Sequence, residues 1–154
     1  MSLKKKYLSS HLVRGVATIV CLTLCTICFS QQIEKKFQWP EGKTFALSLS
    51  FDDARLSQVD GGTTLLDEYG VKATFFVVPA EVEQRLPGWR SAVKNGHEIG
   101  NHTLTHPWSG NYPWSRHKAI ENYTLENMKA ELVDANKKIE TLLGVRPSVF
   151  AYPC

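Results

Sequence analysis

The sequence predicts an α/β fold with a parallel sheet or a partial barrel, and three observations favour it. Segments of strand and helix character alternate along residues 44–152, as in chains built from strand–helix–strand units. The segment Ala73–Val78 is apolar on both faces, which is typical of a strand covered on both sides. Acidic or histidine residues directly follow two of the expected strands, at the sheet edge where α/β folds carry their chemistry.

The first expected strand alternates large apolar residues with small ones. Phe45, Leu47, Leu49 and Phe51 would share one face, with small residues on the other,. An aspartate pair ends this strand. The four expected strands are residues 44–51, 73–78, 97–101 and 148–152.

Three helices are expected between these strands, at residues 61–69, 89–95 and 125–143. The third has the clearest pattern, because apolar residues recur along it at helical spacing and Gly144 follows as a stop,. A polar loop rich in aromatic residues, 107–123, precedes it. The apolar positions of the third helix are Met128, Leu132, Ala135, Ile139 and Leu142.

Residues 1–30 have the pattern of a secretory signal peptide. Four basic residues, Lys4, Lys5, Lys6 and Arg14, precede an apolar run, and small residues lie before Gln31,. The alternative is an uncleaved membrane anchor, but the run is shorter than the ~20 residues that span a bilayer. We therefore expect an exported protein, in the periplasm, at the cell surface or secreted, with no stable membrane insertion after cleavage.

Charge and cysteine content change once this segment is removed. The chain has 18 Lys and Arg against 15 Asp and Glu; residues 1–30 contain four of the basic residues and no acidic one, so one net negative charge remains. Such a balance gives no reason to expect a nucleic acid as partner. Only Cys154 remains of the four cysteines, which excludes a disulfide within residues 31–154 and a cysteine zinc site.

Two stretches at strand ends have the residue types of a metal site. His102 and His106 are four apart, so on a helical turn both imidazoles would point the same way,. A carboxylate from Asp52 or Asp53 would complete a set of two histidines and one carboxylate, which is normal for a catalytic zinc. The second aspartate could then act as a base towards water.

Other interpretations remain open for each stretch alone. A pair of histidines at this spacing often serves solvent or hydrogen-bonding roles, or could hold a purely structural metal. Asp52 or Asp53 could cap a helix that starts near Ala54,. The tryptophans of the aromatic loop, at 108 and 114, could stack on sugar rings or simply pack against the loop.

The motifs Ser50–Asp53, Ala73–Val77 and Gly96–His106, in this order and spacing, resemble the polysaccharide deacetylase family with its NodB-type domain (carbohydrate esterase family 4). The resemblance runs from about Phe45 to the end of the chain and implies a distorted (β/α) barrel. Such barrels typically need ~250 residues. We therefore expect a signal peptide at 1–30, a lead-in segment at 31–43, and a C-terminally incomplete NodB-like domain at 44–154.

The resemblance also implies roles for individual residues. Asp52 would be the general base, and Asp53, His102 and His106 would bind a divalent metal, usually zinc. The substrate would be an N- or O-acetylated polysaccharide, including peptidoglycan-type polymers, and acetate would be released. A backbone N–H near Cys154 would hold the oxyanion.

The sequence departs from the family pattern at three points. Ala54 stands where the family usually has glycine, and residues 151–154 read Ala-Tyr-Pro-Cys instead of Arg-Pro-Pro-aromatic. The arginine that orients the base is therefore missing, and the histidine that acts as general acid would lie beyond Cys154. Two functions follow: a metal-dependent deacetylase, or a catalytically incomplete carbohydrate-binding protein of the same fold.

Overall fold

The computed structural model describes residues 37–153 and divides the chain into two units, Met1–Phe45 and Ala46–Cys154. In the first unit, residues 37–45 form neither helix nor strand, and the Lys43 N–H donates to the Pro40 carbonyl at 2.9 Å in a turn. The expected signal peptide lies outside the described residues, and the domain boundaries stay predictions. No helix among residues 37–153 has the length and apolarity needed to cross a membrane.

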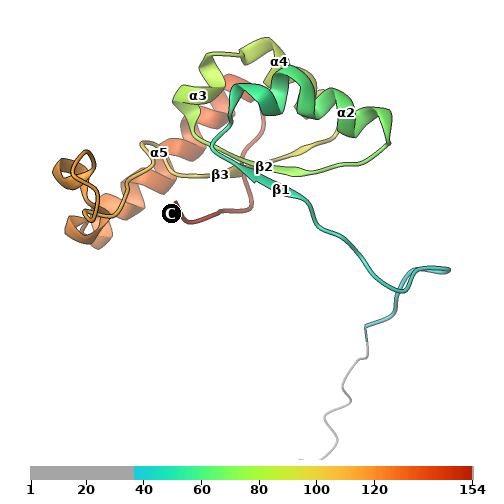
Figure 1. Ribbon diagram of the computed structural model, residues 1–154, viewed down its shortest axis with the longest axis horizontal. Helices are drawn as coiled ribbons and strands as arrows, with labels where there is room; N and C mark the ends of the chain where they lie inside the picture. The colour runs from blue at the N-terminus through green and yellow to red at the C-terminus, as the bar shows by residue number, and fades with distance from the viewer. Residues whose placement is uncertain (1–36, 154) are drawn as a thin grey trace, which may run out of the picture. The chain divides into compact units, whose positions relative to one another are not determined.

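Within the described part of the chain, three strands form a parallel sheet in the order β1-β2-β3 (Figure 1). They are β1 (Ser50–Asp52), β2 (Thr74–Val77) and β3 (Glu98–Asn101). Ser50 is paired with Thr74, and Thr74 with Glu98. Because all three run the same way, their carboxyl ends lie next to one another at one edge of the sheet.

The outer parts of the expected strands differ from the prediction. The strand expected at 44–51 begins only at Ser50, and Phe45 and Leu47 are 77% and 78% exposed. Its partner β2 begins at Thr74, whose N–H donates to the Leu49 carbonyl, so earlier residues have no strand to pair with. The strand expected at 148–152 is reduced to a single parallel bridge between Asn101 and Phe150.

The three expected helices are present, with different bounds for the first two. The first is divided into a π-helical turn, η1 (Gln58–Gly62), and α2 (Thr63–Glu68). The second, α4 (Leu86–Lys94), starts three residues early and follows an unexpected helix, α3 (Pro79–Glu83), which has proline at its first turn,. In the loop after β3, two 3₁₀ turns occur: η2 (Arg116–Lys118) and η3 (Ile120–Asn122).

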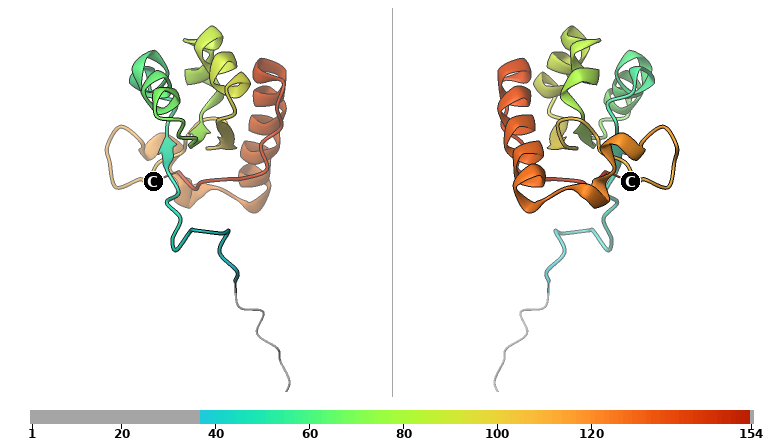
Figure 2. Two further views of the ribbon diagram at one scale, coloured as in Figure 1. Left: turned by 90° about the vertical axis from the view of Figure 1, so that its right-hand side faces the viewer. Right: turned by 90° about the vertical axis from the view of Figure 1, so that its left-hand side faces the viewer.

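The third helix, α5 (Leu125–Leu143), has the bounds that the pattern predicts. Thr124 and Asn127 form a capping box at its start, and Gly144 ends it with φ 73° in the left-handed region,. Figure 2 shows α2, α4 and α5 arranged side by side along one side of the sheet, and α5 contacts both α3 and α4.

The hydrophobic core lies between the sheet and these helices. Phe75 of β2 is buried, stacks on Phe51 of β1 at a ring distance of 5.3 Å and meets the buried Trp89 of α4 edge-on at 5.4 Å. From α5, Ile139 joins the same cluster. His97 is also buried there, and its Nδ1 accepts the Ala73 N–H at 3.3 Å. This core fixes the strand ends that carry the polar residues.

Gly100 of β3 allows a test of side-chain packing around Phe76 and Val149. A Cβ at this position would lie 2.4 Å from the Phe76 ring and 3.1 Å from Val149. We expect Gly100→Ala to lower the free energy of unfolding by about 1–3 kcal/mol through overpacking, measured by urea denaturation. Gly61→Ala is the matched control, since a Cβ there meets nothing within 4 Å. Equal stabilities for both variants would contradict this packing.

Candidate metal centre

The two expected halves of the site lie at adjacent strand ends. Asp52 ends β1 and Asp53 follows it, while His102 follows the last residue of β3. Strand β2 lies between them, and its Val77 carbonyl accepts the His102 N–H at 3.2 Å. Residues some fifty positions apart in the sequence are therefore neighbours because parallel strands end at the same edge.

Three side-chain atoms from these ends form a compact triangle. Asp53 Oδ1 lies 3.5 Å from His102 Nε2 and 3.3 Å from His106 Nε2, and the two Nε2 atoms are 3.1 Å apart. Four ligands placed tetrahedrally around zinc, with bonds of roughly 2.0–2.2 Å, are separated by about 3.3–3.6 Å. The spacing of this donor set therefore fits one small divalent ion, and Asp53, His102 and His106 are the residues that could hold it.

The tautomer of His102 supports the same conclusion. Its Nδ1 lies 3.0 Å from the Ala151 carbonyl oxygen, which can only accept, so Nδ1 carries the hydrogen,. The Nε2 lone pair of this buried ring then faces the Asp53 carboxylate and the His106 ring. If His106 also presents an Nε2 lone pair, the three donor atoms repel one another unless a cation lies between them. Backbone carbonyls orient metal-binding histidines in this way.

Electrostatics keep His106 neutral. Burial lowers the pKa of His106, and the neighbouring His102 lowers it further, although the charges of Asp53 and Asp52 oppose the shift. A histidine with a lowered pKa is uncharged at neutral pH, so its Nε2 can donate a lone pair to a metal.

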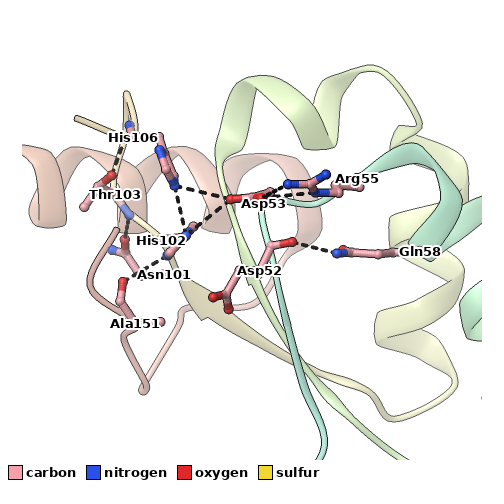
Figure 3. Close-up of polar contacts among 9 residues, drawn as sticks. All are labelled: Asp52, Asp53, Arg55, Gln58, Asn101, His102, Thr103, His106 and Ala151. Atoms are coloured by element: carbon pink, nitrogen blue, oxygen red, sulfur yellow. Dashed lines mark hydrogen bonds and ion pairs between the residues drawn. The ribbon is translucent and has the colours of Figure 1, made fainter. Parts of the chain in front are cut away.

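The two aspartates have different surroundings (Figure 3). The Asp53 carboxylate lies between the histidines and Arg55, whose Nε and Nη2 donate to Oδ2 at 3.2 and 2.9 Å. The Asp52 carbonyl accepts from Gln58 Nε2 at 2.6 Å, and its exposed carboxylate points away from Gln58. Neither aspartate caps the following helical turn, so the capping interpretation is wrong.

The histidine pair does not lie on a helical turn, which corrects the prediction. Thr103 and His106 have φ angles of 69° and 50°, in the left-handed region. Two side chains near this loop bond its backbone: Asn101 accepts the Thr103 N–H at 2.7 Å, and Thr103 Oγ1 accepts the His106 N–H at 3.1 Å. These side-chain bonds replace helical hydrogen bonds and turn both imidazoles towards one point.

A buried carboxylate that the sequence analysis missed holds the same loop. Glu131 of α5 accepts the Leu104 and Thr105 N–H groups on Oε2, at 2.9 and 2.8 Å. Its Oε1 accepts the Thr105 hydroxyl at 2.6 Å. The available signal was its place on the buried stripe of α5, four residues before Ala135. A charged residue on an apolar stripe usually has a specific partner.

A pocket opens beside the triangle. Its volume is about 680 Å³, and its wall includes Asp53 and His106 together with Arg55 and two tryptophans of the aromatic loop, Trp108 and Trp114. The volume is within the roughly 300–1,000 Å³ typical of small-molecule sites. His102 is buried behind the other two ligands, so a substrate group can approach from the side of His106.

Two expected features of the site remain to be placed. Cys154, the expected position of the oxyanion N–H, lies outside the described residues. Ala151 occupies the position where the resemblance places an orienting arginine; its carbonyl holds His102 instead.

Fold and site together define an α/β protein with three side chains that could hold a metal, at the carboxyl edge of a parallel sheet. The chain belongs to the polysaccharide deacetylase family, whose family model matches residues 40–154. This confirms the resemblance and the fold class, a (β/α) barrel type with a parallel sheet.

Relatives with described functions support this membership. The chain is 33% identical over 105 residues to chitin deacetylase 1 of Cryptococcus neoformans, covering 68% of this chain and 20% of the relative. It is 37% identical over 65 residues to a peptidoglycan-N-acetylglucosamine deacetylase of Bacillus cereus, covering 42% and 29%. A gellan lyase of a Bacillus species is 32% identical over 117 residues, covering 75% and 4%.

Solved structures show the same fold. The T48 deacetylase with substrate superposes with a TM-score of 0.56 at 29% identity, covering 69% of this chain and 48% of that one. A mutant of a family pseudoenzyme with restored enzymatic activity has a TM-score of 0.55 at 25% identity, covering 69% and 35%. The chain therefore spans half or less of the length of these relatives.

The donor triangle predicts a stabilising divalent ion. We expect added zinc to raise the free energy of unfolding by about 2.7 kcal/mol when free zinc is ~100-fold above its dissociation constant, measured by thermal unfolding at several zinc concentrations. His106→Ala should abolish this shift. His117→Ala is the matched control, because His117 lines the same pocket but lies outside the triangle. A zinc shift that survives in His106→Ala would contradict the site.

Proposed function

We propose that the protein is an exported, metal-dependent hydrolase that removes acetyl groups from an acetylated polysaccharide. The observation that carries this proposal is the triangle of Asp53, His102 and His106 with a second carboxylate, Asp52, directly beside it in the chain. The bond cleaved would be the amide C–N bond of an N-acetylated amino sugar, with an O-acetyl ester as the second option.

Each residue would contribute a separate part of the chemistry. When bound at the triangle, a divalent metal, most often zinc in such donor sets, supplies Lewis acidity that lets water ionise near neutral pH. Asp52 would accept the proton of the water that attacks the acetyl carbonyl carbon. Asp53 would present Oδ1 as a ligand, because Arg55 holds its second oxygen with two hydrogen bonds. His102, fixed by Ala151, would keep its Nε2 directed at the reacting centre.

The balanced reaction needs a proton at the leaving group. Water adds to the carbonyl carbon, the C–N bond breaks, acetate leaves, and the sugar nitrogen takes up a proton. The resemblance assigns this proton donation to a histidine after the last residue of this sequence. A backbone N–H near Cys154 would stabilise the oxyanion.

The substrate class follows from the relatives and from the pocket. Relatives named for chitin and for N-acetylglucosamine of peptidoglycan support a polymer of N-acetylated amino sugars. The pocket beside His106 opens to solvent with half-exposed to exposed aromatic residues, which suits part of a long polymer better than an enclosed metabolite.

A specific observation favours a second candidate, a carbohydrate-binding protein without turnover. Ala151 stands where an arginine would orient the base, so Asp52 would lack that support. The family includes a pseudoenzyme whose activity a mutation restored. Under this alternative, metal and sugar would bind but no acetate would be released.

Separate aspartate variants test the proposed roles. With zinc and an N-acetylglucosamine pentamer, the protein should release acetate, and a chelator should stop the release until zinc is restored. Asp52→Asn should lower the rate by roughly 10²–10⁴-fold while zinc affinity is unchanged, whereas Asp53→Asn should lose zinc binding. Asp134→Asn, an exposed aspartate of α5, is the control that should retain both.

Two outcomes would decide between the candidates. Pentamer binding without acetate release, in zinc-loaded protein, would favour the binding protein. Acetate release that resists the chelator, or Asp52→Asn at the full rate, would exclude the proposed mechanism.

A further inference from the structure

We propose that the aromatic loop, residues 107–123, forms a sugar-binding subsite next to the metal centre, so that the protein recognises a chain of sugars and not a single acetylated unit. This inference rests on the proposed function and adds the substrate's minimum length to it. The residues that carry it are Trp114, which would stack on a pyranose ring, and Trp108 and Tyr112, which hold Trp114 in place.

The loop is held in one conformation by its own polar groups. Glu121 accepts the Ser109 hydroxyl at 2.6 Å and the Gly110 N–H at 2.9 Å, and these bonds lower the pKa of Glu121. The buried Ser115 donates to the Ser109 carbonyl, and the Ile120 N–H to the Trp108 carbonyl at 2.9 Å. These hydrogen bonds connect the first part of the loop to its last part, and they set the orientation of the backbone that carries the aromatic rings.

The rings form a continuous series that starts at the metal centre. His106 lies 5.1 Å from Trp108, Trp108 lies 5.3 Å from Trp114 edge-on, and Trp114 stacks on Tyr112 at 5.6 Å. Trp108 and Trp114 line the same pocket as His106 and Asp53, whereas Tyr112 lies outside the pocket wall. The pocket therefore extends from a metal ligand to an aromatic platform without interruption.

Two aromatic rings of this loop are exposed to solvent in the described part of the chain. Trp114 is 57% exposed and Tyr112 is 50% exposed, although burial of each ring would be favourable. An ordered loop that keeps large apolar rings in water is typical of a binding surface. Their place beside the triangle fits a ligand that is part of the substrate of the proposed function.

A pyranose ring has the complementary chemistry. Its C–H groups form a weakly positive apolar face that packs on the negative face of an indole, while its hydroxyls remain at the edge. Thr105, His117 and Lys118, which also line the pocket, can bond those hydroxyls,. The acetylated unit would lie at the triangle and a neighbouring unit on Trp114.

Calorimetry in the Asp52→Asn background, which prevents turnover, tests the subsite directly. Zinc-loaded protein should bind an N-acetylglucosamine pentamer more tightly than the monomer. Trp114→Ala should weaken pentamer binding roughly tenfold and leave monomer binding unchanged, and Trp114→Phe should restore most of the affinity. Tyr69→Ala removes an exposed aromatic ring that lies outside the pocket and should have no effect.

The experiments distinguish a failure of the proposed sugar subsite from a failure of the proposed function. Acetate release by the unsubstituted protein combined with pentamer affinity unchanged in Trp114→Ala would overturn the subsite and leave the function standing. A change of oligomeric state in Trp114→Ala, with sugar binding intact, would assign the rings to a protein interface and would also overturn it. Because calorimetry measures binding alone, absence of turnover does not affect the result.

A second, independent observation leads us to infer that Glu131 is a positioning residue for the metal ligands. It touches neither His102 nor His106, but it accepts both N–H groups of the two residues before His106, Leu104 and Thr105. The adjoining residues Thr103 and His106 have left-handed φ angles. The carboxylate thus fixes the span between the two imidazoles.

The geometry makes Glu131 difficult to replace. Its side chain is buried, so an alanine would leave two N–H groups of the loop without an acceptor, which is costly if they stay buried. The loop could recover those bonds only by moving towards water, which would move His106 away from Asp53. Removal of Glu131 would therefore weaken metal binding more than general destabilisation does.

Zinc affinity, measured by competition with a chromophoric chelator, separates positioning from stability. Glu131→Ala should weaken zinc binding by roughly 10–100-fold, and Glu131→Gln, which keeps one acceptor oxygen, by less. Ile139→Ala, a core truncation on the same helix, should lower the melting temperature and leave the zinc affinity of the folded protein unchanged. Glu140→Ala, an exposed carboxylate of α5, should change neither.

Two results would overturn this role. One is unchanged zinc affinity in both Glu131 variants. The other is an equal loss of zinc affinity in Ile139→Ala, which would mean that Glu131 contributes only to folding. If Glu131→Ala does not fold, the role is tested by the smaller loss of zinc affinity expected for Glu131→Gln.

Discussion

Backbone strain concentrated at the metal centre is the constraint on which the rest of the site depends. Among residues 37–153, the non-glycine residues with positive φ are Asp53, Ala54, Thr103 and His106, and all four belong to the two loops that supply the ligands. A left-handed conformation costs an L-residue roughly 1–2 kcal/mol. Such strain persists only where the surroundings determine the conformation, and for Thr103 and His106 hydrogen bonds to the buried side chains of Asn101 and Thr103 do so.

The parallel sheet explains why these loops meet. The β1 and β3 ends are separated by β2 alone, and the core around Phe75 holds the three strands in register. At the next position, the bridge between Asn101 and Phe150 brings the Ala151 carbonyl to His102. The aspartate and the two histidines therefore come from distant parts of the sequence but are supported by the same few strand residues.

The periodicity of the sequence was sufficient to predict the elements but not the shape of the loops. Helix α5 has its predicted bounds because apolar spacing, the Thr124 cap and Gly144 agree. The residues at 102–106 were expected to be helical from their spacing alone, and this was wrong because Asn101 and Glu131 take the N–H groups that a helix would use. The candidate ligands could be predicted to lie together because their residue types and motif order are specific, whereas Glu131 and Arg55 act through contacts that depend on the fold.

Helix α5 connects the two parts of the site. Its first half carries Glu131, which holds the histidine loop, and its start is capped by Thr124 directly after the aromatic loop. The same helix also binds the last residue of β3, because Asn101 donates to the Leu132 carbonyl and to Asn136 at 2.9 and 2.8 Å. A displacement of α5 would therefore move the histidine loop and the start of the aromatic loop together, so the two proposed parts of the site depend on the position of one helix.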